Sequence, residues 1–513
     1  MPTRRALSTA ALALAALCAA VGARAQESGD LGLRGGATTA GAGAADAGAA
    51  DEPLRRLDDR ALAGGDYGTA DAPLAGGGYG GEAQPDRRAT EPPASTIDVG
   101  NPFARRPALS TGANALRPRR SIPADDPYAP RGVRAGTFTL RPTLESAVGY
   151  DSNPDRDPVG GKSSKFYRLR GDIEATSDWS RHELRAQATG QIRRYVDLDA
   201  PGYEPEVNAT ADGRIDVTER TQIVTQLRAS ITTSRPGDPD TPTDIDGDEI
   251  SRSYGATLGV AQRFNRLSLR LDGLADRYLY DDSKLLDGST LDNSDRVYNA
   301  YQLRLRAAYE VSPALAPFAE IAVDTRDYDR RFGDDIVGDG ADASRRRLGS
   351  DGWALRGGAR FEATRLVTGE LAVGYGRQTP KDDRLKPVDG LLFDGSVAWA
   401  PTALTTVRLN ARSSIDETVT EGSGGILRRS VGVAVEHALR RNLLLTGRVD
   451  YETADYKGAD RTDDTLVLGL EAEYRLNRTL ALISSFQHER RYSNLPGEDY
   501  DASIIEFGLR VRQ

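Results

Sequence analysis

The chain has 513 residues, 67 of them basic and 76 acidic, and a formal net charge of −9 at pH 7. Its single cysteine excludes a disulfide framework, and its mean hydropathy of −0.51 argues against a bundle of apolar membrane helices. The low hydropathy does not exclude a membrane β-barrel, because lipid-facing and lumen-facing residues alternate along its strands and average to a polar composition.

The N-terminal residues have the features of a secretory signal peptide. Arginines at positions 4 and 5 precede an apolar run over residues 6–21, and the small-residue triplet Ala-Arg-Ala follows at 23–25. We expect residues 1–25 to be cleaved. Cleavage would remove Cys18, three arginines and no acidic residue, so the net charge would move from −9 to −12. The exported protein would then have no thiol chemistry.

Residues 26–131 are rich in Ala, Gly, Pro, Asp and Arg, with stretches such as GGATTAGAGAADAGAADE and GGGYGGEAQPDRRATEPPAS. This composition offers too little apolar surface to offset the entropy that is lost when a backbone is ordered. We therefore expect a disordered, low-complexity periplasmic tail, which would be available to a periplasmic partner.

The pattern changes near Thr137, and alternation of apolar and polar residues begins. Over residues 138–150, Phe, Leu, Pro, Leu, Ser, Val and Tyr occupy one set of positions, and the first polar residues of the other set are Thr, Arg, Thr and Glu. This period of two is that of a β-strand. It recurs to the end of the chain, so we expect one β domain over residues 132–513.

The connections between the expected strands alternate in length. Short turns are expected near 178–181, 218–220, 265–266, 312–314, 364–365, 401–402, 440–442 and 477–478, and longer polar loops near 151–164, 197–203, 235–249, 282–295, 331–350, 380–386, 419–425, 457–462 and 493–500. Eight turns and nine loops predict eighteen strands. An even strand number, short periplasmic turns and longer extracellular loops are typical of outer-membrane barrels.

Aromatic residues lie at both ends of the expected strands, as the two interfacial girdles of a membrane barrel require. Those beside short turns are Phe264, Tyr309, Phe361, Trp399 and Tyr474, and those near long loops are Tyr150, Tyr278, Trp353, Tyr375 and Tyr456. We expect these ten side chains at the two membrane interfaces.

A soluble β-sandwich or propeller would show the same alternation. Expected strands of about 12 residues or more, against about 5 to 6 in soluble proteins, favour the membrane fold together with the signal peptide and the rhythm of the connections. The sequence thus predicts an all-β fold, a transmembrane antiparallel up-and-down β-barrel of about 18 strands, in the outer membrane and preceded by a disordered tail.

Residues 126–158, DPYAPRGVRAGTFTLRPTLESAVGYDSNPDRDP, contain two short motifs around the first strand. Gly132, Arg134 and Gly136 precede the strand, and Tyr-Asp-Ser-Asn at 150–153 follows it. This arrangement resembles a family of outer-membrane β-barrel porins of Gram-negative bacteria, porin-2-like proteins in which a low-complexity exported tail precedes the barrel. The resemblance implies the same fold for the rest of this chain.

Charged residues are frequent on the face of the strands that would line the lumen. We expect the pore lining to include Arg185, Arg228, Arg304, Arg306, Arg356, Arg360, Arg408, Arg412, Arg448, Glu471, Glu473 and Arg475. An arginine-rich pore favours anions. The alternative is that these charges pair across strands and only fill or hydrate the lumen.

The sequence contains no pattern that points to catalysis. Only three histidines are present, and His182 and His437 fall close to periplasmic turns, away from a surface hydrolase site. The acidic stretches at 238–249 and 334–342 are better interpreted as solvated loops, since the first lacks the EF-hand spacing of a calcium site. We expect no enzyme activity, no metal site, no cofactor and no nucleic-acid partner.

The function that we predict is a porin-like channel for the passive diffusion of small hydrophilic solutes, including anions. The alternative is a structural or accessory barrel that helps to export or anchor a surface polysaccharide. The expected partners are outer-membrane lipid, lipopolysaccharide and the barrel-assembly machinery. Many barrels end in an aromatic residue that this machinery recognises, whereas this chain ends Arg-Val-Arg-Gln at 510–513.

Overall fold

The structure is a computed structural model that describes residues 127–197, 203–235, 241, 245–329, 349–418, 420 and 422–513. All of these belong to one compact unit, Thr90–Gln513. The predicted signal peptide and residues 26–126 of the predicted tail lie outside the described residues. In the described part of the chain, no helix is long and apolar enough to span a membrane.

Nearly all of the described chain is β-strand. The long strands are β2 (Phe138–Asp151), β3 (Ser164–Ser177), β4 (Glu183–Tyr195), β5 (Tyr203–Asp216), β6 (Thr221–Ser234), β7 (Glu249–Phe264), β8 (Leu267–Tyr280), β11 (Tyr298–Tyr309), β12 (Leu315–Tyr328), β13 (Ser350–Thr364), β14 (Val367–Pro380), β15 (Val388–Thr402), β16 (Thr405–Asp416), β17 (Ile426–Arg440), β18 (Leu443–Tyr456), β19 (Arg461–Arg475), β20 (Leu480–Ser493) and β21 (Tyr500–Arg512). The short elements are β1 (Val133–Ala135), β9 (Ser283–Lys284), β10 (Thr290–Leu291) and the 3-10 helix η3 (Ser294–Arg296).

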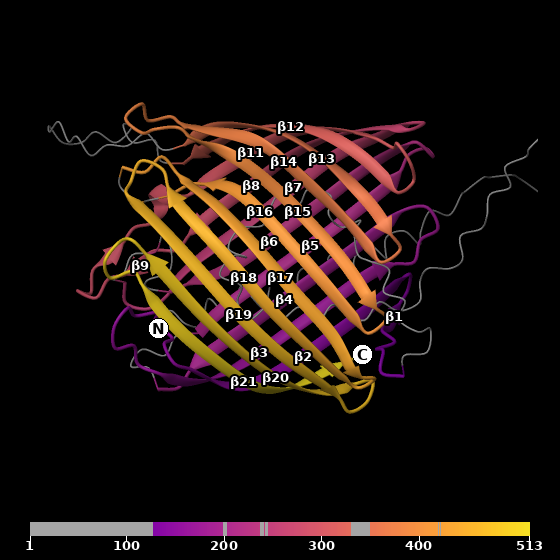
Figure 1. The fold of residues 1–513 in the computed structure, drawn as a ribbon. Coiled ribbons are helices and arrows are strands. Elements are labelled where there is room, and N and C mark those ends of the chain that lie inside the picture. The colour runs from indigo at the N-terminus through magenta and orange to yellow at the C-terminus, as the bar shows by residue number, and fades with distance from the viewer. Residues whose placement is uncertain are drawn as a thin grey trace, which may run out of the picture. The chain divides into compact units, whose positions relative to one another are not determined.

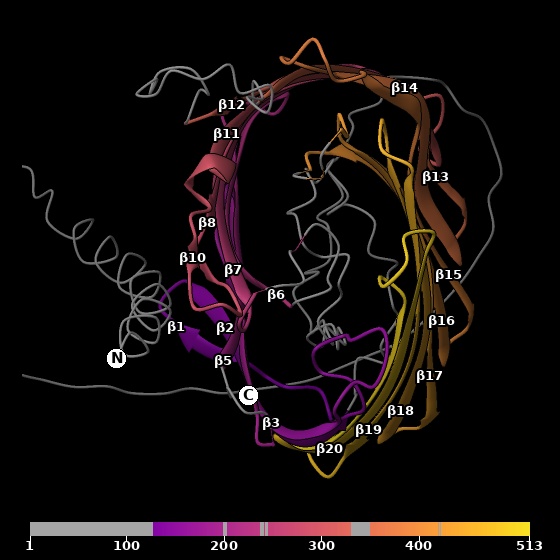
Figure 2. The same cartoon turned by 90° about the vertical axis from the view of Figure 1, so that its left-hand side faces the viewer.

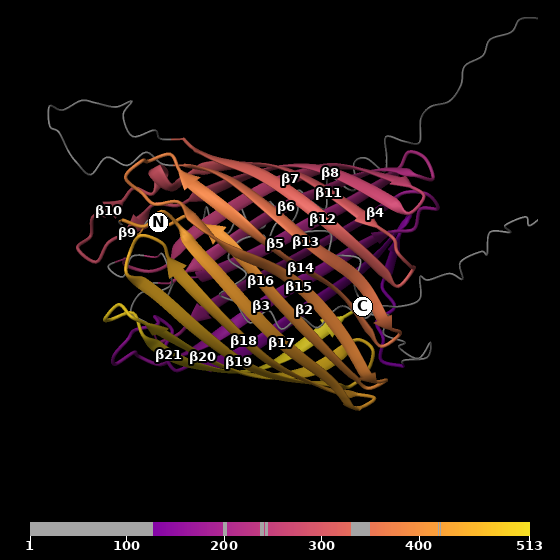
Figure 3. The same ribbon diagram turned by 45° about the horizontal axis from the view of Figure 1, so that its top comes forward.

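The long strands form one closed antiparallel barrel, inclined to its axis (Figures 1 and 3). Each pairs with its neighbours in sequence, β8 pairs with β11 across the β9–β10 loop, and β2 pairs with β21 to close the sheet. Closure pairs the first and last strands of the sheet with each other, as a barrel in lipid requires. The prediction of about 18 strands is confirmed.

The connections also follow the predicted rhythm. The short ones cover residues 178–182, 217–220, 265–266, 310–314, 365–366, 403–404, 441–442 and 476–479, and each lies at the expected place. Four of them have two residues, and in the one after β7 Asn265 has a φ of 55°. Asparagine tolerates this left-handed conformation, which two-residue hairpin turns require. Local turn chemistry therefore sets the strand boundaries at this end.

Alternation along the strands separates an apolar outer face from a polar inner face. On β2, for example, Leu144 is 52 % exposed on the outside whereas the adjacent Glu145 is 4 % exposed on the inside. Because successive side chains of a strand point to opposite faces, the same division holds for the whole wall. The apolar outer surface is the one that lipid would cover.

Most of the aromatic residues predicted at the interfaces lie on the outer face. Tyr150, Phe264, Tyr309, Trp353, Tyr375, Trp399 and Tyr474 are exposed there, and Phe361 is half-buried against Gly369. Two positions are corrected. Tyr278 stacks on Tyr298 and lines an internal cavity, and Tyr456 is fully buried with Ile426. Both occupy the inward parity of their strands, so their rings cannot reach lipid.

The seam between the first and last strands is closed by two segments. Strand β21 pairs with residues 143–151 of β2, its C-terminal part. Strand β1 folds back through Gly136 and pairs with residues 138–140 of β2. Gly136 has a φ of 60°, which glycine adopts without steric cost. The structure also places residues 127–131, predicted as tail, against the barrel, since Arg512 donates to the Tyr128 carbonyl.

Buried ion pairs join the two sides of this seam from within. Arg510 of β21 lies 3.0 Å from Glu145 of β2 and also contacts Glu473. Arg168 of β3 bridges Glu145 and Glu506 at 2.5 and 2.7 Å. These residues form a continuous charged network on the inner face of the seam, which we call the seam network.

One part of the wall is split. The ladder between β15 and β16 stops at the Asp394–Arg412 pair, although β15 stays paired with β14, and β16 with β17, beyond that level. Just above it, the Ser413 hydroxyl accepts from the Phe393 N–H and donates to its carbonyl. The outer face of β17 then packs on the inner face of β15, since a Cβ at Gly390 would lie 2.9 Å from Leu427. The end of the β16–β17 hairpin thus lies inside the ring (Figure 2).

Removing the Arg510 guanidinium from the seam network should destabilise the barrel. We expect Arg510→Gln to lower the free energy of unfolding by about 3–5 kcal/mol, because the buried carboxylates that it contacts lose their counter-charge. Arg134→Gln is the control, since Arg134 is mostly exposed and lies 3.6 Å from Asp178, and it should cost less than about 1 kcal/mol. Urea titration in detergent micelles measures both. Equal losses would contradict the role of the seam network.

Candidate functional site: the barrel interior

Most of the charged residues predicted to line the pore make ion pairs on the inner face. The pairs are Arg185–Glu174 (3.7 Å), Arg228–Asp276 (2.8 Å), Arg304–Asp272 (3.0 Å), Arg306–Glu370 (2.8 Å), Arg356–Glu320 (3.2 Å), Arg408–Glu436 (3.5 Å), Arg448–Asp450 (2.9 Å), Arg475–Glu473 (2.7 Å) and Glu471–Arg510 (3.5 Å). Much of the predicted cationic wall is therefore neutralised by neighbouring carboxylates.

Two of the predicted arginines differ from the rest. Within the described part of the chain, Arg360 and Arg412 make neither an ion pair nor a hydrogen bond. Arg360 is exposed near the end of β13, and Arg412 is half-buried on β16, where it lines the internal cavity. Asp394 and Asp416 act on Arg412 only at longer range. These two guanidinium groups are therefore the predicted pore arginines whose charge no described carboxylate compensates through an ion pair.

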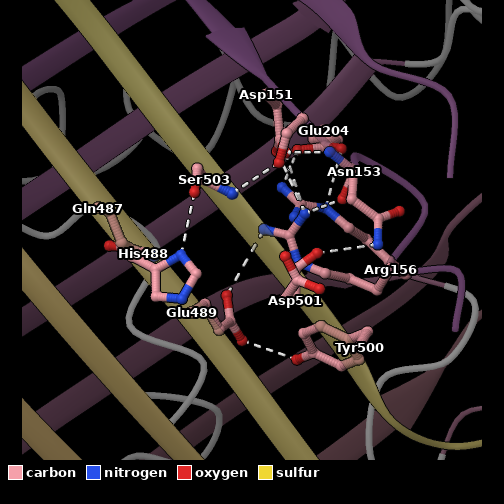
Figure 4. A network of polar contacts seen from close by, with 12 residues as sticks. Asp151, Asn153, Arg156, Glu204, Gln487, His488, Glu489, Tyr500, Asp501 and Ser503 are labelled. Carbon is pink, nitrogen blue, oxygen red and sulfur yellow. Dashed lines mark hydrogen bonds and ion pairs between the residues drawn. The ribbon is translucent and has the colours of Figure 1, made fainter.

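The loop after β2, residues 152–163, is tied to the inside of the ring. Arg156 contacts the Asp151 carboxylate at 3.2 Å and the Glu489 carboxylate of β20 at 3.5 Å, and its guanidinium also donates to the Asn153 carbonyl (Figure 4). The Asn153 amide donates to the carbonyls of Asp157 and Asp501. This loop therefore narrows the mouth of the barrel.

Arg156 is held in an unfavourable backbone conformation. Its φ of 58° lies in the left-handed region, which costs a non-glycine residue on the order of 1–3 kcal/mol. The side-chain contacts offset this cost. Burial alone would lower the pKa of Arg156, but the carboxylates of Asp151 and Glu489 raise it above its ordinary value, so the guanidinium stays charged. Arg156 thus stabilises the inward position of the loop together with Asn153, which bonds to Asp501.

A cavity of about 550 Å³ lies inside the ring between β6–β8 and β11–β18. On one side, Tyr278, Tyr298 and Tyr328 stack from strand to strand, with ring centroids 4.5 and 4.9 Å apart. Across the cavity lie Arg412 and the end of the β16–β17 hairpin. The lining combines aromatic rings with both signs of charge, which suits small polar solutes.

The end of the β16–β17 hairpin is anchored across this cavity by Glu417. Its carboxylate accepts hydrogen bonds from Arg326 at 2.6 Å, from the Ser350 hydroxyl at 2.6 Å and from the Tyr328 hydroxyl at 3.4 Å. Arg326 also donates to the carbonyl of Ile415. These contacts hold a second inward element opposite the Arg156 loop.

Residues 126–513 match the family described as "Putative beta-barrel porin 2". The chain belongs to this porin family. The match covers the whole barrel, and the protein is accordingly a protein of the outer membrane. The description is that of a porin and not of an enzyme.

No curated protein matches this porin. Solved structures with a similar fold include the outer membrane protein OpdK of Pseudomonas aeruginosa (12% identity, TM-score 0.36, covering 73% of this chain and 99% of that chain). Others are OccK3 (OpdO) of Pseudomonas aeruginosa (13%, 0.36, 73% and 95%) and the siderophore receptor PiuA of Acinetobacter baumannii (8%, 0.41, 75% and 82%).

The motifs that carried the resemblance have structural roles in this porin. In the Tyr-Asp-Ser-Asn motif, Tyr150 faces outward and the Asp151 carboxylate accepts a hydrogen bond from Arg156. The Ser152 hydroxyl accepts one from the backbone of β21, and the Asn153 amide donates one to the loop backbone. Gly132, like Gly136, has a positive φ in the turn region around β1. The motifs thus build the seam and the hinge of the inward loop.

Several residues of the porin interior were not predicted. Arg156 was expected only as part of a loop, and Glu417, Tyr298 and Tyr328 were not singled out. The acidic loops were expected to be free of metal, and among the described residues no group of three or more His, Cys, Asp or Glu side chains could hold an ion. Residues 330–348, which include the stretch 334–342, lie outside the described residues, as do residues 238–240 and 242–244 of the other acidic stretch.

Releasing the Arg156 loop should widen the mouth of the porin. Because Arg156→Gln removes the ion pairs to Asp151 and Glu489, we expect a higher single-channel conductance in planar bilayers. Arg384→Gln is the matched control, since Arg384 is a loop arginine whose ion pair with Asp382 lies within its own loop. An unchanged conductance of the Arg156 variant would show that this loop does not limit the pore.

Proposed function

We propose that this porin is a channel for the passive diffusion of small hydrophilic solutes, with a preference for anions. The observation that carries the proposal is the presence of Arg360 and Arg412 on an inner wall whose other predicted arginines are paired. Unpaired cations along a pore lower the electrostatic barrier for anions. A barrel of this strand number is wide enough for a water-filled lumen.

Two inward elements would set the size limit of the channel. The loop at 152–163 and the end of the β16–β17 hairpin enter the ring from different strands. Charged side chains hold both in place, Arg156 in the loop and Glu417 in the hairpin, whose strand β17 also stays paired with β18. Selection would thus combine a narrowed passage with a local positive potential. The proposal includes no catalysis, metal or cofactor.

Reversing the two unpaired charges should remove the anion preference. For Arg360→Glu with Arg412→Glu, we expect the ratio of anion to cation permeability to fall by at least about twofold, because carboxylates then face the ions. The reversal potential in a potassium chloride gradient measures this ratio. Arg377→Glu is the control, since Arg377 is exposed on the outer face of β14. An unchanged ratio in the double variant would remove the basis for anion selection.

A folded barrel without conductance would instead favour the accessory role in polysaccharide export or anchoring. We further propose contacts with lipopolysaccharide around the outer face, insertion by the barrel-assembly machinery, and a periplasmic partner for the tail. The exposed apolar outer surface supports the lipid contact, since such a surface must be covered.

A further inference from the structure

The split between β15 and β16 is closed by side chains and not by a backbone ladder. Val388 and Leu392 on the inner face of β15 pack against Leu427 of the tucked β17, and all three are buried. Ala354 and Ile415 complete this apolar seal. Such contacts are non-directional and can be broken without leaving backbone hydrogen-bonding groups unsatisfied. The seal therefore opens at a lower cost than an intact backbone ladder.

The outer side of the split faces the region that lipid covers. Val373 of β14 and Leu391 of β15 are 54 % and 55 % exposed on the outer face, with Tyr375 beside Leu391. Beyond the split, Val431 of β17 is also exposed on the outside. Apolar side chains at this level contact acyl chains, with the tyrosine at the interface. An opening here would lead into the outer leaflet.

The inner side of the split carries a cation, Arg412, whose nearest carboxylates in the described part of the chain, Asp394 and Asp416, interact with it without forming an ion pair. Arg412 belongs to the last rung of the β15–β16 ladder, directly below the seal, and lines the cavity. Within the described ranges it makes no ion pair or hydrogen bond. An apolar seal and a guanidinium that makes no ion pair with the described residues therefore lie next to each other at the boundary between lumen and lipid.

From this juxtaposition we propose that the split is a lateral route between the lumen and the outer leaflet for an amphiphile with one apolar chain and an anionic head group. The head group binds Arg412, and the chain takes the place of the contacts of Leu427 with Val388 and Leu392. As the seal opens, the end of the hairpin moves further into the lumen together with the adjoining end of β18, to which β17 stays paired. This movement requires release of Glu417 from Arg326, Ser350 and Tyr328. This route is separate from axial diffusion of hydrophilic solutes.

The route predicts that a fatty acid reaches residues that are buried in the closed wall. The probe is dodecanoic acid with a terminal diazirine, photolysed with the full-length protein in lipid vesicles, and the adducts are mapped by mass spectrometry. We expect adducts on Val388, Leu392 and Leu427. Labelling only of exposed outer residues such as Leu391 would overturn the proposal, because lipid contact alone explains it.

A disulfide across the seal distinguishes opening from simple access. Because the only native cysteine is Cys18, the pair Val388→Cys with Leu427→Cys can be oxidised selectively. Oxidation should abolish adducts at Leu392, and reduction should restore them. The control pair is Leu409→Cys with Val433→Cys, which face each other in the intact β16–β17 ladder and should leave labelling unchanged. Labelling of Leu392 in the locked protein would overturn the proposal.

The head-group site has its own matched pair of variants. Arg412→Gln should weaken binding of the probe by about tenfold, the loss of one charge-assisted hydrogen bond. Arg408→Gln, on the same face of β16 but paired with Glu436, should not weaken it. Equal losses in both variants would overturn the assignment of Arg412.

Ion conductance of the locked protein separates this proposal from the proposed function. Conductance that persists in the locked barrel supports a lateral route distinct from the axial pore. Conductance that disappears together with labelling would overturn the lateral route, because the hairpin would then gate the axial pore. A barrel that never conducts but still shows labelling that depends on the lock would refute axial diffusion and leave the lateral route standing.

Discussion

The structure depends on the requirement that every backbone hydrogen-bonding group in lipid finds a partner within the protein. A sheet meets this requirement only when it closes on itself, so β2 must meet β21 and the number of strands must be even for both to run antiparallel. Closure in turn forces one face of every strand inward. Most charged side chains on the inward face lie in pairs, because a counter-charge nearby stabilises a buried carboxylate or guanidinium.

Those inward charges divide into two groups with different consequences. Where acid and base alternate between neighbouring strands, as in the seam network, they add cohesion and little net potential. Where an arginine makes no ion pair with the described residues, as at Arg412, its charge is compensated only in part, by carboxylates farther away. The local potential inside a barrel thus depends on how its charges are paired and not only on their total number.

The fold could be predicted from the sequence because its determinants are local. A period of two and turns such as Asn265-Arg266 are visible in short windows, and they determine strand number and order. The inward position of Tyr278 and Tyr456 was missed because the place of a residue near a strand end does not show which face it occupies. Neighbouring residues of a strand point to opposite faces, so a difference of one position decides between lumen and lipid. The Arg156 loop and the split wall depend on contacts between distant strands, as in Arg156–Glu489 and Gly390–Leu427, which have no short-range pattern.

The seam also affects the order in which the barrel assembles. The edge of β2 is completed partly by β1, a few residues upstream, and partly by β21 at the very end of the chain, and Arg512 reaches back to Tyr128. The first and last strands of the barrel domain therefore share one junction. Without β21, residues 143–151 of β2 have no partner on that side, so the ring can close only after the last strand of the domain is in place.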